Sequence, residues 1–106
     1  MRVGVDTRMT TDSRRPSYTV EYAPAALRVL EKLDPSVGRK VYSDIEKLRE
    51  NPRPQGVAKL ETKEKLYRVY VGPGKNYRAI YQIRDEVLLV LVVKLGDRKE
   101  VYRRVK

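Results

Sequence analysis

The sequence contains no cysteine, histidine, phenylalanine or tryptophan. Without cysteine the chain has no disulfide framework, thiolate nucleophile or zinc finger, which fits a reducing cytoplasm. Without histidine it lacks the ordinary general base of neutral pH and the commonest transition-metal ligand, so we expect no metal and no other cofactor. No stretch approaches the roughly 20 apolar residues of a membrane span, and no secretory apolar region follows Met1. We therefore expect a cytoplasmic protein that does not enter a membrane.

Positive charge is in large excess and unevenly distributed. The 106 residues carry 24 basic and 14 acidic side chains, a net charge of +10. Residues 65–106 contribute eleven basic and four acidic residues, or +7, whereas residues 18–64 contribute only +1. Such a surface attracts polyanions, and nucleic acid is the first candidate. A basic surface that only confers solubility, or one that binds an acidic protein, is the alternative.

The N-terminal half predicts a short strand and two helices within one domain, residues 18–106. A polar, aperiodic tail, residues 1–17, precedes this domain, and we expect it to be disordered. Residues 18–22 alternate between apolar and polar side chains, as in a half-buried strand. Pro24 and Pro35 suit the first turns of two helices, the second of which is capped by Asp34. An inward apolar stripe on this second helix consists of Val37, Val41, Ile45 and Leu48.

The C-terminal half predicts an antiparallel meander. After a loop and an exposed connector at 57–65, Leu66–Val71 and residues 77–83 alternate as strands on either side of a turn. Residues 87–93 form an apolar run typical of a strand in the middle of a sheet, covered on both faces. Residues 99–103 are a candidate for a short final strand. The predicted fold is α+β, with a two-helix hairpin on one face of a small, mainly antiparallel sheet of four to five strands.

Strand alternation assigns the side chains to two faces. Tyr67, Val69 and Val71 are expected to face the helices, which leaves Arg68, Tyr70 and Arg78 on the open face. Arg98 and Tyr102, which follow the apolar strand, are expected to close the same surface. Arginines there can pair with phosphates while tyrosine rings stack on unpaired bases. The residues predicted to contact RNA are Tyr70, Lys75, Lys94, Lys99 and Arg103. Solvated strand charges and edge packing are the structural alternatives.

Three segments, taken in order, resemble the RelE branch of the RelE/ParE toxins. They are Leu-Tyr-Arg-Val at 66–69, Asn-Tyr-Arg-Ala-Ile-Tyr-Gln-Ile at 76–83 and Gly-Asp-Arg-Lys-Glu-Val-Tyr at 96–102. The order of elements and the Ala-Pro-Ala-Ala start of the first helix also match. The resemblance spans about residues 18–104, and it implies a RelE-like fold related to that of microbial ribonucleases.

The resemblance also implies an activity, partners and roles for individual residues. It implies a toxin of a type II toxin–antitoxin system, a metal-independent endoribonuclease that cuts messenger RNA in the ribosomal A site by 2′-hydroxyl attack and so inhibits translation. Its partners would be the ribosome, messenger RNA and an acidic RelB-like antitoxin. Arg68 matches a catalytic basic residue and Arg78 a phosphate-binding arginine. Arg98 matches an arginine that stabilises the transition state or acts as an acid, and Tyr102 a tyrosine that stacks on the target nucleotide.

Two positions depart from the family pattern. The founding members have a second basic residue two positions after Arg68, where this chain has Tyr70, and many relatives have histidine where it has Asp97. The identity of the proton acceptor is therefore open. Two other functions remain possible on the same scaffold: inhibition of DNA gyrase in the manner of ParE, and RNA binding by a member whose catalysis has decayed.

Overall fold

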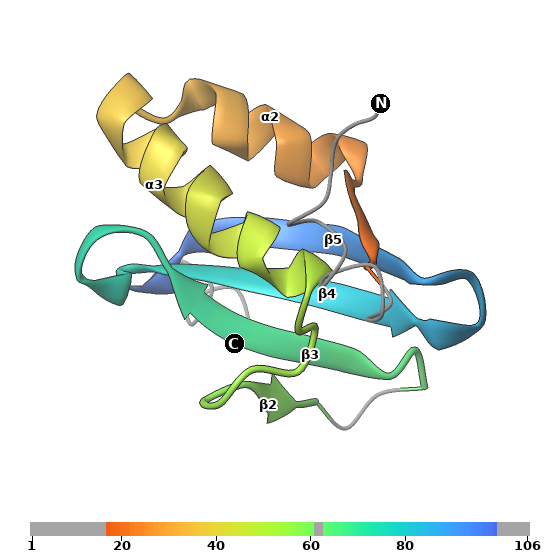
Figure 1. Cartoon of the computed structure of the whole chain (residues 1–106). Coiled ribbons are helices and arrows are strands. Elements are labelled where there is room, and N and C mark those ends of the chain that lie inside the picture. The colour runs from red at the N-terminus through yellow and green to blue at the C-terminus, as the bar shows by residue number, and fades with distance from the viewer. Residues whose placement is uncertain (1–16, 61–62, 100–106) are drawn as a thin grey trace, which may run out of the picture.

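The computed structural model describes residues 17–60 and 63–99, which form two helices above one twisted sheet (Figure 1). The strands are β1 (Thr19–Tyr22), β2 (Ala58–Lys59), β3 (Leu66–Val71), β4 (Tyr77–Arg84) and β5 (Leu89–Asp97). The helices are α2 (Pro24–Lys32) and α3 (Pro35–Glu46), and single 3-10 turns occur at η2 (Lys47–Arg49), η3 (Pro73–Lys75) and η4 (Asp85–Val87). The predicted fold class is confirmed. Of the predicted N-terminal tail, all but Ser17 lies outside the described residues.

The sheet has the strand order β1-β5-β4-β3-β2. β1 runs parallel to β5, and the three remaining pairs are antiparallel, as the predicted meander requires. β5 is therefore an interior strand, as expected from its apolar sequence. Its side chains alternate between buried Val90 and Val92 and half-buried Leu89, Leu91 and Val93. The prediction that both faces of this strand are covered is thus wrong, because the face away from the helices keeps part of its solvent contact.

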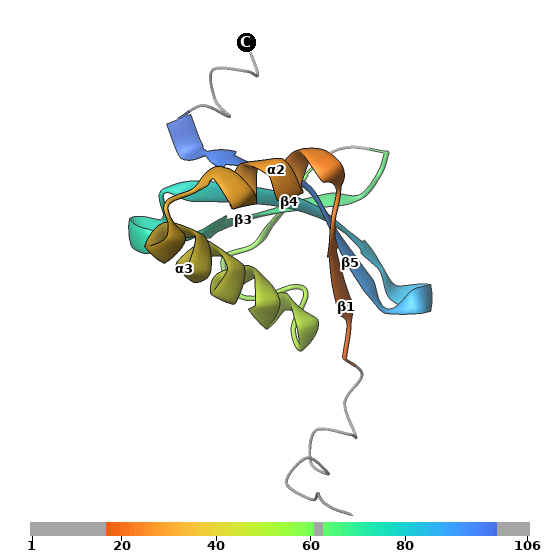
Figure 2. The same ribbon diagram turned by 90° about the horizontal axis from the view of Figure 1, so that it is seen from above.

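Both helices begin with proline and pack on the same face of the sheet. Pro24 and Pro35 occupy the first helical turns, where the missing amide hydrogen breaks no intrahelical bond. The predicted side-chain cap by Asp34 is wrong: its side chain makes no capping hydrogen bond, and its backbone carbonyl accepts the Gly38 amide at 2.7 Å. In the view from above, α2 crosses over β4 and β5 (Figure 2). Within the described residues no helix is long and apolar enough to cross a membrane.

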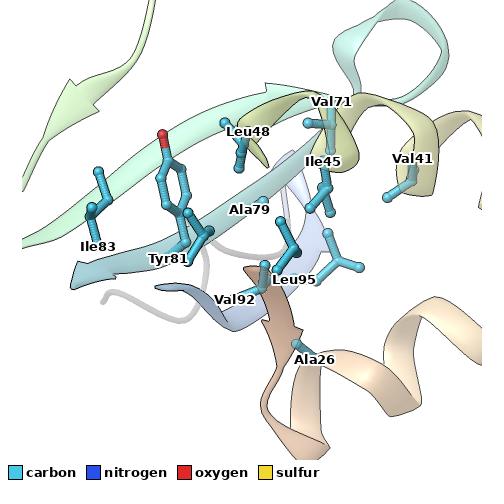
Figure 3. Close-up of a cluster of buried hydrophobic side chains, with 12 residues drawn as sticks. Ala26, Val41, Ile45, Leu48, Val71, Ala79, Tyr81, Ile83, Val92 and Leu95 are labelled. Carbon is cyan, nitrogen blue, oxygen red and sulfur yellow. The ribbon is translucent and has the colours of Figure 1, made fainter. Parts of the chain in front are cut away.

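The hydrophobic core fills the space between the helices and the sheet. Val41, Ile45 and Leu48 point down from α3 and η2, as their spacing predicts, towards Ala79 and Tyr81 of β4 (Figure 3). Tyr81 is completely buried and donates its hydroxyl hydrogen to the backbone carbonyl of Pro52 at 2.7 Å. The other buried apolar residues are Val20, Ala26, Val71, Ile83, Val90, Val92 and Leu95. All the core positions on β3 and β4 belong to the face that strand alternation assigned to the helices.

The structure differs from the sequence-based expectation in three local features. The connector at 57–65 contains the two-residue strand β2, which pairs with β3. The apolar run does not begin a strand at Val87, because η4 and Leu88, which has a left-handed φ of 52°, still belong to the turn. β5 then extends to Asp97, and Arg98 and Lys99 are helical. Lys99 is therefore not part of the predicted final strand, whose other residues lie outside the described part of the chain.

Candidate functional site

Paired strands place Tyr70 and Arg78 directly opposite each other on the open face. Tyr70 of β3 is in register with Arg78 of β4, and Arg68 is in register with Ile80. Because alternate residues of a strand point to the same side, Arg68 shares the face of Tyr70 and lies diagonally from Arg78. The structure thus brings together three of the residues that alternation assigned to this surface.

The end of β5 adds a second arginine beside Tyr70. Gly96 is in register with Arg78, and Asp97 with Tyr77. One residue later, the backbone amide of Arg98 donates to the carbonyl of Asn76 at 3.0 Å, which ties the end of β5 to the start of β4. Arg98 can then reach across β4, and its guanidinium carbon lies 4.1 Å from the centre of the Tyr70 ring.

Three guanidinium groups therefore surround one tyrosine. Besides Arg98, the guanidinium carbons of Arg68 and Arg78 lie 5.4 and 5.7 Å from the ring centre. These distances fall within the range of cation–π attraction between each guanidinium group and the ring. Below, these four residues are called the Tyr70 cluster. Arg68, Arg78 and Arg98 were predicted to converge, whereas the central position of Tyr70 was not foreseen.

The Tyr70 cluster concentrates positive charge on a tyrosine hydroxyl. Arg78 Nη2 donates a long hydrogen bond of 3.5 Å to Tyr70 Oη, and this bond is the largest cause that holds the pKa of Tyr70 below its usual value. Partial burial opposes the shift, and the charges of Arg68, Arg78 and Arg98 reinforce it. Arg78 is itself only 6% exposed. Within residues 17–60 and 63–99, neither Arg68 nor Arg98 forms an ion pair with a carboxylate, so both can accept an anionic ligand.

Two open hollows adjoin the cluster. One, of about 640 Å³, has Arg98 and Lys99 in its wall together with Asn76, Tyr77 and Asp97. The other, of about 600 Å³, has Tyr70 at one side. Its basic lining residues are Lys40, Lys47 and Lys75. Helix α3 also lines both hollows, with Val37 in the first and Asp44 in the second, and Lys40 and Lys47 are paired with Asp44, so each hollow lies between the cluster and the helix layer.

The remaining predicted contact residues are distributed around the cluster. Lys75 lies in the exposed η3 loop, and Lys99 is exposed beside Arg98, with its amide bonded to the Asp97 carboxylate at 2.7 Å. Lys94 is exposed on β5 opposite Ile80, on the same face as Arg78. Tyr102 and Arg103 lie outside the described residues, so their predicted roles stay predictions.

The loop between β3 and β4 is held by contacts that the sequence did not reveal. Asp44 of α3 accepts the Gly72 amide at 2.9 Å and pairs with Lys40 at 3.2 Å and Lys47 at 3.6 Å. Partial burial raises the pKa of Asp44, but the Gly72 amide and the two lysines together lower it below its usual value. Lys40 and Lys47 lie at helical spacing from Asp44, but the Gly72 amide belongs to another layer of the fold, so no local pattern marks this contact with the loop. It fixes the strand ends that carry Tyr70 and Arg78.

A second network anchors the opposite end of the sheet. Arg53 donates to both carboxylate oxygens of Asp85, at 3.3 and 2.8 Å, and Tyr18 donates to the same carboxylate at 2.5 Å. Arg53 also donates to the hydroxyl of Tyr67 at 3.3 Å. These residues join the loop after η2, β1 and the β4–β5 turn. Tyr67 is adjacent to Arg68 in sequence but packs against the core on the other face of the sheet, so we assign this network a structural role.

Comparisons with known proteins identify the family of this chain. Residues 20–102 match the family model described as ParE toxin of type II toxin-antitoxin system, parDE. A RelE-like toxin protein of Escherichia coli is 30% identical over 87 residues, which cover 80% of this chain and 90% of that protein. The mRNA interferase toxin RelE of Escherichia coli K12 is 28% identical over 88 residues, 81% of this chain and 90% of that protein.

The fold is also found among solved structures. The toxin chain in the crystal structure of the intact Escherichia coli RelBE toxin–antitoxin complex superposes with a TM-score of 0.65 and 26% sequence identity. This superposition covers 76% of the present chain and 96% of the matched one. The family model covers most of the sequence, and the relatives and the fold agree with it. The chain therefore belongs to the RelE/ParE family and is a RelE-like toxin of a type II toxin–antitoxin system.

Proposed function

We propose that this toxin is an endoribonuclease that cuts messenger RNA in the ribosomal A site, in the cytoplasm, by attack of a ribose 2′-hydroxyl on the adjacent phosphate. The observation that carries the proposal is the convergence of Arg68, Arg78 and Arg98 from three separate segments onto one open sheet face. The relatives named mRNA interferase support the choice of substrate. The +10 net charge supports binding to a polyanion.

The arginines can stabilise the negative charge that develops in this reaction. In-line attack builds negative charge on the phosphoryl oxygens, and fixed positive groups stabilise that charge without reorganising during the reaction. At an effective dielectric constant near 20, one guanidinium about 4 Å from a unit charge contributes roughly 4 kcal/mol. Ground-state binding of the phosphate uses part of this, so the effect on rate is smaller. Two or three such contacts can supply much of the catalysis without a metal ion.

Each arginine has a distinct place relative to a bound phosphate. Arg78 is nearly buried and fixed by its neighbours, which suits a residue that positions the scissile phosphate. Arg98 lies at the rim of an open hollow and suits the stabilisation of developing charge. Arg68 completes the cluster from the second strand. Lys75, Lys94 and Lys99 bind flanking phosphates. Tyr102, matched by the resemblance, stacks on the target nucleotide, and Arg103 contacts the RNA beside it.

An acidic antitoxin is the proposed inhibitor. The similar toxin chain of Escherichia coli was crystallised as an intact RelBE toxin–antitoxin complex. For the present chain, a partner with acidic side chains would neutralise the Tyr70 cluster and cover the open sheet face. Inhibition would then consist of excluding the RNA phosphate from the arginines.

The test uses programmed ribosomes and four proteins: the wild type, Arg78→Ala, Arg98→Ala and the control Arg84→Ala. Arg84 lies on β4 like Arg78 but is exposed at the far end of the strand, where it bonds to Gln82. The control removes the same charge without touching the cluster. Messenger RNA ends are mapped after incubation with and without ribosomes. We expect codon-phased cuts with the wild type and with Arg84→Ala, a loss of about 100-fold or more with either cluster variant, and slow cleavage of free RNA.

Other outcomes separate the alternative functions. Equal cleavage on and off ribosomes would refute ribosome dependence. When the wild type is induced in cells, intact transcripts together with growth arrest and DNA damage would indicate a gyrase inhibitor. RNA binding without cleavage would indicate a decayed enzyme. Retention of full activity in both cluster variants would refute the assignment of the site.

A further inference from the structure

Tyr70 differs from a stacking platform in one respect: positively charged groups already occupy the space around its ring. The guanidinium carbon of Arg98 lies only 4.1 Å from the ring centre, which places it against a ring face, and Arg68 and Arg78 lie within 6 Å. A nucleobase that stacked on the face covered by Arg98 would have to displace that guanidinium group. The hydroxyl, by contrast, accepts a hydrogen bond of 3.5 Å from Arg78.

We propose that Tyr70 is the proton acceptor for the attacking 2′-hydroxyl group, with its phenolate form stabilised by the three arginines around it. This inference rests on the proposed function and adds the group that the sequence left open. An ordinary tyrosine is a poor base near neutral pH because its pKa is about 10 and little of it is ionised. General-base catalysis is most effective when the pKa lies near the operating pH. The arrangement of Arg68, Arg78 and Arg98 moves Tyr70 in that direction.

The reaction transfers one proton to Tyr70 and one proton from water to the leaving group. The Tyr70 phenolate takes the 2′-hydroxyl proton while the 2′-oxygen forms a bond to phosphorus and the bond from phosphorus to the 5′-oxygen breaks. The leaving 5′-oxygen takes a proton from water, and the products carry a 2′,3′-cyclic phosphate and a 5′-hydroxyl. Tyr70 then returns its proton to water. No oxidant, metal or cofactor takes part in this sequence.

The charged groups around Tyr70 favour the phenolate. Arg68 faces it from its own strand, Arg78 from β4 and Arg98 from the segment after β5. The hollow on its other side is bounded by charged residues of α3 and the η3 loop, namely Lys40, Asp44, Lys47 and Lys75. The one carboxylate in that set is already engaged by two lysines and the Gly72 amide. Among the described residues, the charge facing Tyr70 is therefore predominantly positive.

Asp97 is the obvious competing base, because it directly precedes Arg98. Its register partner is Tyr77, which packs against the core on the helix side of the sheet, whereas Tyr70 and Arg78 face the open side. Its carboxylate also accepts the Lys99 amide at 2.7 Å. Strand alternation therefore directs Asp97 away from the phosphate that the three arginines would hold.

The decisive variant is Tyr70→Phe, which keeps the ring and its contacts with the guanidinium groups but removes the hydroxyl. Single-turnover cleavage is measured on programmed ribosomes across a range of pH for the wild type, Tyr70→Phe, Arg68→Ala and the control Tyr42→Phe. Tyr42 is an exposed tyrosine on α3 that stacks against Tyr22 in the helix layer. We expect the wild-type rate to rise with pH up to the pKa of Tyr70 and then to level off.

The expected changes separate a base from a merely structural tyrosine. Tyr70→Phe should lower the rate about 100- to 10,000-fold, the usual share of a general base, and should abolish the pH-dependent rise while leaving ribosome binding intact. Arg68→Ala should keep the rise but move it to higher pH, because one stabilising charge is lost. Tyr42→Phe should change neither the rate nor its pH dependence.

A second measurement needs no activity. The near-ultraviolet absorbance of tyrosinate is followed as the free protein is titrated. We expect the transition at lowest pH to vanish in Tyr70→Phe, to move to higher pH in Arg68→Ala and to persist in Tyr42→Phe. Retention of that transition in Tyr70→Phe would overturn the inference.

The two proposals fail in different ways. If the wild type cuts and Tyr70→Phe cuts equally fast or keeps the pH-dependent rise, the role of Tyr70 is overturned. The nuclease proposal then stands. A wild type that does not cut messenger RNA under any of these conditions would overturn the nuclease and, with it, the proton acceptor.

Discussion

The two faces of the sheet are built from the same strands and have opposite chemistry. On the helix side, β3 and β4 present Val71, Ala79 and Tyr81, each at most 2% exposed. One residue away along the same backbones, Tyr70 and Arg78 belong to the Tyr70 cluster. Because side chains alternate along a strand, Val71 and Ala79 are each next in sequence to a residue of the Tyr70 cluster on the opposite face. A substitution on the helix side should therefore lower the stability of the fold, whereas a substitution at the neighbouring open-face position should weaken RNA binding.

The open face also shows how the helix side supports the site. Asp44 and Gly72 hold the β3–β4 loop against α3, and the Arg98 amide is bonded to Asn76. These contacts fix the ends of β3, β4 and β5. The guanidinium groups are therefore positioned by the backbone that carries them. The arginines thus gain a preorganised position from contacts made by Asp44, Gly72 and Asn76.

The largest expected effect is on the helix side. Tyr81→Ala should lower the free energy of unfolding by about 3–5 kcal/mol, because it empties a fully buried aromatic site and leaves the Pro52 carbonyl without its donor. Chemical denaturation followed by circular dichroism measures this change. Tyr70→Ala serves as the matched control on the open face and should cost much less. Equal losses would contradict the division between the two faces.

The next effect concerns the open face. Arg98→Ala should weaken binding of single-stranded RNA by about 1.5–3 kcal/mol, the typical contribution of a hydrogen bond to a charged group. It should also reduce the slope of log affinity against log salt by about 0.7, the value for one lost phosphate contact with a single strand. Titration of RNA carrying a 2′-deoxy substitution at the cut site measures both without cleavage. An unchanged slope would show that Arg98 does not contact phosphate.

A smaller effect is expected at Gly72, in the loop between β3 and β4. Gly72 has a φ of 86°, and a Cβ atom there would lie 2.9 Å from Val41 Cγ2 and 3.0 Å from Tyr77 Cδ1. Gly72→Ala should therefore cost about 1–3 kcal/mol through backbone strain and crowding. Gly56→Ala is a useful control, because its φ of 90° is equally strained but nothing lies within 4 Å of its Cβ. The difference between the two variants isolates the steric part.

The smallest effect is a dependence of stability on alkaline pH. Burial raises the pKa of Tyr22 and of Tyr81 well above the usual value, so these phenols ionise more readily in the unfolded chain. Their contribution to the free energy of unfolding is complete below about pH 10 and is lost as the pH rises above that value. At one pH unit above it, each group has lost roughly 1.4 kcal/mol. Tyr70, whose pKa is lowered, contributes in the opposite direction. In urea unfolding, Tyr81→Phe should therefore reduce the alkaline loss, and Tyr70→Phe should enlarge it.

Local sequence patterns were sufficient for most of the elements and for their faces. The alternation in Leu66–Val71 correctly directed Tyr67 and Val69 to the core and Arg68 to the open side. The three-and-four spacing of α3 correctly identified Val41 and Ile45 as buried. These predictions succeeded because helix and strand periodicity are properties of the backbone itself.

Other features depended on contacts that no local pattern contains. β2 is only two residues long and exists because it pairs with β3. Val87 and Leu88 are apolar, yet they belong to the turn, because pairing of β4 with β5 begins at Arg84 and Leu89. A register shift between Ile80 and Tyr81 also lies in this pair. Strand pairing and register decided each of these outcomes.

Sequence alone determined that this chain carries a basic open sheet face and that Arg68, Tyr70 and Arg78 belong to it, because side-chain direction follows from the strand repeat. Only the tertiary structure decided that Arg98 reaches Tyr70 across β4 and that three guanidinium groups enclose one phenol. The reason is physical: these contacts join segments distant along the chain, and the alignment of whole strands brings them together.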